Sequence, residues 1–171
     1  MTTTRDAILD AVTDLVLETR GVPSIAAVAA RVGLTKQGVL HHFPSRAALD
    51  VAVLERAVAR VDAVMEEAAR SGSPTAAYLE LSSPSREDHA AVAVVAALVA
   101  DAHEVPALLA DSTARWEALI ARETGDPVHA AVVRLVGDGL MAESVVTGGT
   151  LAPERVAALV TWLSPARGGA R

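Results

Sequence analysis

The sequence predicts an all-α protein, with a three-helix N-terminal head, a larger C-terminal helical bundle and about nine helices in all. Three observations support this prediction. Apolar residues recur at helical spacing along most of the 171 residues. Breaks rich in glycine, proline or serine separate these segments, and none alternates like a strand. Hydrophobic residues make up 51% of the chain and aromatic residues 2%, which suits a helical core built from small side chains.

The first helix is expected over residues 4–20. Its apolar face comprises Ile8, Leu9, Val12, Leu15 and Val16. Gly21 ends it and Pro23 prevents its continuation. The same helix carries acidic residues spaced four apart, namely Asp6, Asp10, Asp14 and Glu18. Because like charges at this spacing slightly oppose helix formation, we expect this acidic stripe to face water or basic partners.

Residues 25–46 predict a helix-turn-helix. A short helix ends at Val32, Gly33 makes the bend, and a second helix runs from Thr35 to His42. The small Ala29 permits close approach of the two helices, and Gly33 can adopt a positive φ. The side chains expected to point inward are Val28, Val32, Leu34, Val39 and Phe43. An ordinary helical hairpin with a polar face is the alternative that the spacing leaves open.

The remaining helices are expected from Ser45 to about 70 and over about 75–81, 85–102, 105–123, 127–147 and 153–164. The breaks between them contain Ser71–Pro74, Ser82–Pro84 and Gly148–Gly149. We place the head at residues 1–46 and the body at 47–171, linked by the long helix 45–70. The tail, Arg167–Arg171, is expected to be disordered.

The helix-turn-helix segment resembles the DNA-binding domain of the tetracycline-repressor (TetR) family over roughly residues 5–55. The matching stretches are Ser24–Ala29, Val32–Lys36 and His42–Arg46, followed by Ala48 and Leu49. The sequence departs from the family pattern at Gln37, where a glycine is frequent, and at Leu40 and His41, where a tyrosine is common. The resemblance implies a transcriptional regulator, usually a repressor, that dimerises through its last two long helices and responds to a small-molecule effector.

These considerations assign candidate DNA contacts on a double-stranded operator. Lys36 and Gln37 are the candidates for reading bases, although Gln37 is equally interpretable as a solvated surface residue. The candidates for phosphate contacts are Ser24, Thr35, His42 and Arg46, and His41 could replace the tyrosine. Gly38 would keep the helix close to the floor of the groove.

The body carries two further candidate sites. The dimer surface is predicted from the apolar faces of the last two helices, comprising Val132, Val133, Val136, Leu140, Val156, Leu159, Val160 and Leu163. The alternative is that these faces complete the core of one subunit. An effector pocket is predicted around Tyr78, His89, His103 and Trp116; each of these residues also has a simpler interpretation as core or surface.

The charge balance restricts where nucleic acid could bind. The net charge is −6, but residues 1–50 hold five basic and five acidic groups, so the excess acid belongs to the body. Lys36 is the only lysine in the chain.

Other function classes find little support. With no cysteine, phosphate-binding loop or nucleophile elbow, we expect neither an enzyme nor a cofactor, and we expect no metal site. The longest apolar run, residues 90–100, is too short to span a membrane, and no signal peptide is recognisable. We therefore expect a cytoplasmic protein with no membrane partner. The rival function is a helical module that binds another protein rather than an operator.

Overall fold

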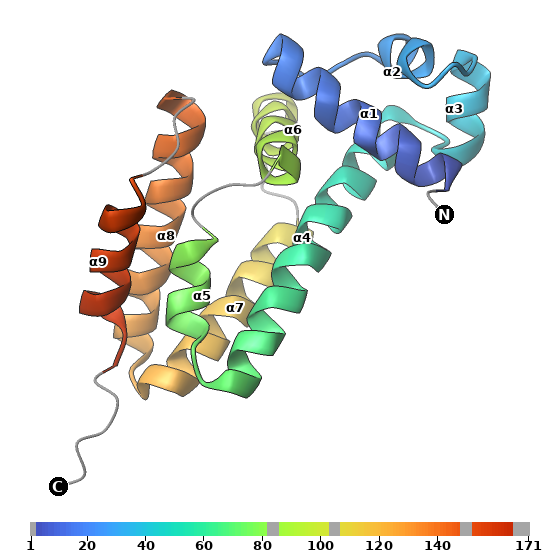
Figure 1. Ribbon diagram of the computed structural model, residues 1–171. Helices are drawn as coiled ribbons and strands as arrows, with labels where there is room; N and C mark the ends of the chain where they lie inside the picture. The colour runs from blue at the N-terminus through green and yellow to red at the C-terminus, as the bar shows by residue number, and fades with distance from the viewer. Residues whose placement is uncertain (1–2, 82–85, 103–106, 148–151, 166–171) are drawn as a thin grey trace, which may run out of the picture. The chain divides into compact units, whose positions relative to one another are not determined.

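The computed structural model describes residues 3–81, 86–102, 107–147 and 152–165. These residues form nine α-helices and no strand (Figure 1), which confirms the predicted fold class. The helices are α1 (Thr4–Thr19), α2 (Ile25–Arg31), α3 (Lys36–His42), α4 (Arg46–Ser71), α5 (Pro74–Glu80), α6 (Arg86–Ala102), α7 (Ala107–Thr124), α8 (Pro127–Thr147) and α9 (Pro153–Leu163). The predicted tail and the breaks at 82–84 and 148–149 lie outside the described residues.

The chain divides into two compact units. Unit 1 comprises Met1–Val58 and Ser85–Leu109, and unit 2 comprises Ala59–Pro84 and Ala110–Arg171. Helices α4 and α7 each contribute residues to both units. The compact unit that contains the head therefore also contains α6. The division that we placed at residue 46 concerns function, and it stays a prediction.

Unit 1 has one continuous apolar core. It joins α1, α2, α3, the first part of α4 and α6, and α6 packs directly on α1. The fully buried side chains include Ile8 and Val12 from α1, Phe43 after α3, and Leu49 from α4. From α6, Ala90 and Val94 enter the same core. The small Ala90 side chain allows α6 to lie close to its neighbours.

Local sequence signals set the ends of α1. The Thr3 side chain accepts a hydrogen bond from the Asp6 N–H at 3.1 Å, and the Asp6 carboxylate accepts one from the Thr3 N–H at 3.0 Å, which is a capping box. At the other end Arg20, not Gly21, takes the left-handed conformation, with φ of 55°. The Arg20 N–H donates to the Val16 carbonyl at 2.8 Å, so the helix closes one residue before the glycine.

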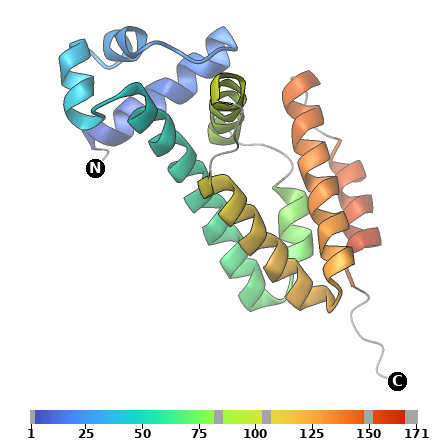
Figure 2. The ribbon, with the colours of Figure 1, turned by 180° about the vertical axis from the view of Figure 1, so that it is seen from behind.

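Unit 2 contains α5, α8 and α9 together with parts of α4 and α7. Helix α5 packs on both α8 and α9. Two opposite views show α8 and α9 side by side (Figures 1 and 2). His129 Nε2 lies 2.7 Å from the Leu163 carbonyl, which joins the start of α8 to the end of α9. Met65, Leu79, Ile120 and Val133 are fully buried in this unit.

None of the described helices combines the length and hydropathy needed to cross a bilayer.

Candidate nucleic-acid interface

The connection between α2 and α3 is a tight turn at Gly33. Gly33 has φ of +69°, and the Leu34 N–H donates to the Ala29 carbonyl at 2.9 Å. Both helices start with hydroxyl caps: Ser24 Oγ accepts from the Ala27 N–H at 3.2 Å, and Thr35 Oγ1 accepts from the Gly38 N–H at 3.0 Å. The predicted turn is confirmed, and Thr35 is the N-cap of α3.

The inward-facing set of the helix-turn-helix is also confirmed. Val28, Val39 and Phe43 are buried, and Ala29 is buried between the two helices. Val32 and Leu34 are half-buried and pack against the same core. The polar residues of this segment are therefore left on the opposite surface.

The outer surface of α3 carries most of the candidate DNA contacts. Thr35, Lys36, Gln37 and His41 are exposed, whereas Gly38 and His42 are half-buried. No carboxylate in the described residues pairs with Lys36. A Cβ added at Gly38 would meet its nearest neighbours at 3.5 Å, an ordinary contact, so packing inside the head does not require a glycine there.

Three arginines join the helices of the head to one another. Arg31 of α2 binds Glu18 of α1 through two hydrogen bonds of 3.0 and 2.5 Å, and its Nη1 lies 4.0 Å from Asp14. The hydrogen bonds that Arg31 donates to the Glu18 carboxylate raise the pKa of Arg31 above its usual value. Together with the pairing of Asp10 described next, these contacts show that three of the four residues of the acidic stripe, Asp10, Asp14 and Glu18, face arginines.

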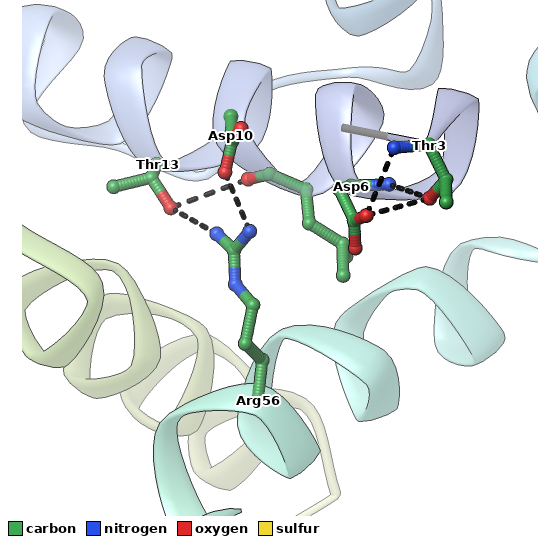
Figure 3. A network of polar contacts seen from close by, with 6 residues as sticks. Thr3, Asp6, Asp10, Thr13 and Arg56 are labelled. Carbon is green, nitrogen blue, oxygen red and sulfur yellow. Dashed lines mark hydrogen bonds and ion pairs between the residues drawn. The ribbon is translucent and has the colours of Figure 1, made fainter. Parts of the chain in front are cut away.

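Arg56 of α4 reaches α1 between two polar side chains (Figure 3). It donates to Asp10 Oδ1 at 2.6 Å and to Thr13 Oγ1 at 3.0 Å. In the same figure Asp6 lies against Thr3 at the start of α1. Hydrogen bonds from the Thr3 hydroxyl and then the Thr3 backbone hold the pKa of Asp6 below its usual value.

Arg46 is engaged inside the head. Its Nε lies 2.8 Å from both carboxylate oxygens of the buried Asp50, and its Nη1 donates to the Pro23 carbonyl. It thus ties the start of α4 to the loop between α1 and α2. A phosphate contact by Arg46 stays a prediction, and these internal bonds compete with it.

Arg5 has a role in the head that was not predicted from the sequence. Its Nη1 donates to the His42 carbonyl at 3.3 Å, and its guanidinium lies 4.3 Å from the centroid of the Phe43 ring. Arg5 therefore supports the C-terminal end of α3 from α1. Nothing in the sequence marks this pairing, because the partners are 37 residues apart.

The body brings together two of the four predicted pocket residues. Tyr78 and Trp116 are both buried, and their ring centroids are 6.4 Å apart. His103 lies outside the described residues, as does the side chain of His89. His89 belongs to α6 and hence to unit 1, whereas Tyr78 and Trp116 belong to unit 2. The role of these residues in ligand binding stays a prediction.

The polar ends of both rings are bound by carboxylates. Tyr78 Oη donates to Asp138 at 2.6 Å, and Trp116 Nε1 donates to Asp62 at 2.7 Å. Burial, and then the charge of Asp138, raise the pKa of Tyr78 far above its usual value. Arg134 bridges Glu117 at 2.5 Å and Asp138 at 2.8 Å. Among the described residues, no group of three or more metal-binding side chains occurs.

The predicted dimer surface is only partly on the surface of the subunit. Val133, Leu140 and Leu163 are buried within the subunit, although Leu140 also lines the groove between α8 and α9. Val132 is 41% exposed, and the half-buried members are Val136, Val156, Leu159 and Val160. The most exposed large apolar residues of these helices were not among those predicted from the sequence; they are Val128, Leu135, Val146 and Trp162.

An open groove of about 770 Å³ lies between α8 and α9. Its lining consists of Leu135, Val136, Gly139, Leu140, Glu143, Arg155, Ala158, Leu159 and Trp162. Glu143 and Arg155 form an ion pair of 2.9 Å within it.

Solved structures of known proteins share this fold. A transcriptional regulator from Rhodococcus sp. Rha1 is 21% identical, with a TM-score of 0.76 over 94% of each chain. A TetR-family member from Streptomyces coelicolor A3 is 25% identical, with a TM-score of 0.68 over 96% of this chain and 100% of that one. The multidrug binding protein EbrR, complexed with imidazole, is 24% identical, with a TM-score of 0.62 over 98% of each chain. No curated protein matched the chain.

A family model supplies the decisive comparison. The C-terminal domain of tetracyclin repressor-like proteins matches residues 72–164, which is more than half of the chain. With its helix-turn-helix head and all-α fold, the protein belongs to the tetracycline-repressor (TetR) family of transcriptional regulators.

Proposed function

We propose that this regulator is a ligand-responsive repressor that binds a near-palindromic DNA operator as a homodimer. The observation that carries the proposal is the outer face of α3, where exposed Thr35, Lys36, Gln37 and His41 stand on a buried apolar core. A short helix with this division of residues can enter the major groove.

Lys36 and Gln37 are the proposed base-reading residues. Both are exposed at the start of α3, the end that meets base edges in helix-turn-helix proteins. Lysine can donate to guanine, and glutamine can pair with adenine through two hydrogen bonds. Ser24, Thr35, His41 and His42 are the proposed phosphate contacts, and Gly38 lets the backbone of α3 approach the groove.

The charges of the head set the expected strength of non-specific binding. Arg31 and Arg46 of the head are paired with carboxylates, and Arg56 of α4 is paired with Asp10 of the head. These arginines therefore contribute little to the positive electrostatic potential that would attract DNA phosphates. Because non-specific affinity depends on the number of phosphates neutralised, we expect a shallow salt dependence.

The homodimer is proposed to form through α8 and α9. Their shared surface exposes large apolar side chains, which a soluble protein normally covers. Two-fold symmetry would then place the two α3 helices roughly 34–36 Å apart, one turn of DNA.

We propose that a bound ligand affects the head through helices that contribute to unit 1. Helix α4 contributes to both units, and α6 packs on α1 through the core that holds Ala90 and Val94. A ligand bound in unit 2 would move α4 and change the separation of the two heads. Ligand and operator would then weaken each other's binding by the same factor.

Selection of bound fragments from genomic DNA, followed by band shifts, tests the proposal. We expect the folded protein to retain a fragment with two inverted half-sites about 10 base pairs apart. The rival function, a helical protein-binding module, predicts that no fragment is retarded even at low salt, and that result would overturn the proposal.

A further inference from the structure

Gly139 occupies a position in α8 where nothing inside the subunit requires a glycine. It lies within the helix, where glycine costs about 1 kcal/mol relative to alanine. A Cβ added there would have no atom within 4 Å, and Gly139 has no positive φ. Neither packing nor backbone conformation within the subunit explains it. It does, however, line the groove between α8 and α9, where its missing side chain leaves room for a group from outside.

Trp162 supplies a group of the right kind on the same face. Its side chain is 77% exposed, although tryptophan is among the most costly residues to leave in water. Leu135, 59% exposed, lines the groove with it. One surface thus carries both a projecting ring and a hollow. An interface between two copies related by a two-fold axis needs this self-complementarity, because the same surface meets itself.

The charges of the groove favour a second copy as the occupant. The chain carries a net charge of −6, which would repel another copy at most surfaces. The groove lining holds one acidic and one basic residue, Glu143 and Arg155. The Glu143 side chain is 43% exposed and the Arg155 side chain is 54% exposed. The lining is therefore neutral, and each of these two side chains can meet its opposite on a partner.

The available area also fits a second copy. From the 21 residues of α8 and the 11 of α9, a rise of about 1.5 Å per residue and a width of about 10 Å give a face on the order of 500 Å². Two copies would bury on the order of 1,000 Å², about the minimum for a specific interface. An interface this small depends on a few anchoring side chains, and tryptophan is enriched among such anchors.

We propose that Trp162 of each copy packs into the α8–α9 groove of the other, over Gly139, and that Glu143 and Arg155 exchange partners across the two-fold axis. This inference rests on the proposed homodimer and names the residues that specify it. It also separates α8–α9 residues that build the subunit, such as Val133 and Leu163, from those that recognise the partner.

Sedimentation analysis of four proteins over a range of concentrations tests the inference. Trp162→Ala should raise the dimer dissociation constant at least about 30-fold, the effect of losing an interface anchor. Gly139→Leu should also raise it, because a Cβ at this position meets no atom of the subunit within 4 Å and the leucine side chain would extend into the groove. Val51→Ala is the matched control, since Val51 is exposed on α4, away from α8, α9 and the groove lining, and it should dimerise like the unchanged protein.

Tryptophan quenching supplies a second readout. The chain has two tryptophans, and Trp116 is buried within the subunit. Acrylamide should therefore quench Trp162 at concentrations where the protein is monomeric and lose access to it when the dimer forms.

Two outcomes would overturn the inference, and they differ in whether the proposed function is also contradicted. If Trp162→Ala and Gly139→Leu dimerise like the unchanged protein and still bind the operator, the anchor is wrong and the proposed function stands. If the unchanged protein is monomeric at all concentrations, both the anchor and the proposed homodimer fail.

Discussion

At the scale of single residues, Gly33 sets the geometry between α2 and α3. Its φ of +69° lies in the left-handed region, which costs an L-residue with a side chain about 1–2 kcal/mol. A Cβ there would meet no atom within 4 Å. The constraint is therefore conformational and not one of space.

Replacing this glycine gives a clear expectation. Gly33→Ala should lower the free energy of unfolding by about 1–2 kcal/mol, measured by urea denaturation. Gly21→Ala is the control, because Gly21 also has open space around it but no positive φ. Equal effects of the two substitutions would show that left-handed strain at Gly33 has been misassigned.

Tyr78 gives an expectation in alkaline solution. Its pKa is raised by burial and by Asp138, relative to 10.0 for a free tyrosine. The protonated ring therefore contributes stability below about pH 10 that is lost as the pH rises further, because the unfolded chain ionises first. Since Tyr78 is the only tyrosine, tyrosinate absorbance should stay low near pH 10 while the protein is folded.

Tyr78→Phe should remove this alkaline loss of stability. A tyrosinate signal with a midpoint near pH 10 and unchanged helical circular dichroism would contradict the burial of Tyr78 against Asp138.

At the scale of elements, ion pairs stabilise the helices, and the contribution of each pair to stability depends on its burial. Asp50 is 6% exposed and is bound by Arg46, which also holds the loop at Pro23. Removing one partner of such a pair leaves a buried charge unpaired.

Arg46→Ala should therefore destabilise the protein by about 2–3 kcal/mol. Arg70→Ala breaks an ion pair with Glu67 in which both side chains are at least 65% exposed, and it should cost less than about 1 kcal/mol. Urea denaturation of the two variants measures the difference. Similar small losses would mean that Asp50 is adequately solvated without Arg46.

The order and bounds of the helices could be predicted from the sequence because the breaks are strong local signals. Gly33 bends the chain before α3, as expected; Thr35 caps α3, and Pro153 begins α9. Each of these signals acts within a few residues. The expected and observed helix bounds therefore agree to within about two residues.

The packing partners of the helices could not be predicted in the same way. The apolar residues of α6 are alanines and valines that could fit several neighbours, so nothing in the sequence shows that Ala90 and Val94 join the core of the head. In α8, apolar residues occur on both sides of the helix. Periodicity alone could not separate the buried Val133 from the exposed Leu135.

At the scale of the whole molecule, DNA binding would depend on two heads held at a fixed separation. Each head offers few free cations, since two of its arginines, Arg31 and Arg46, are paired with carboxylates. One head should then bind weakly, and the pair should bind strongly only where two half-sites match their spacing.

The most direct test is the affinity of the purified dimer for its selected operator, measured against salt concentration for the unchanged protein, Lys36→Ala and Gln37→Ala. We expect Lys36→Ala to weaken binding and to reduce the slope of log affinity against log salt by about 1. Gln37→Ala should relax the preference at one base pair by about 1–3 kcal/mol. If both variants, folded and dimeric, bind with unchanged affinity, slope and preference, α3 does not enter the groove and the account is wrong.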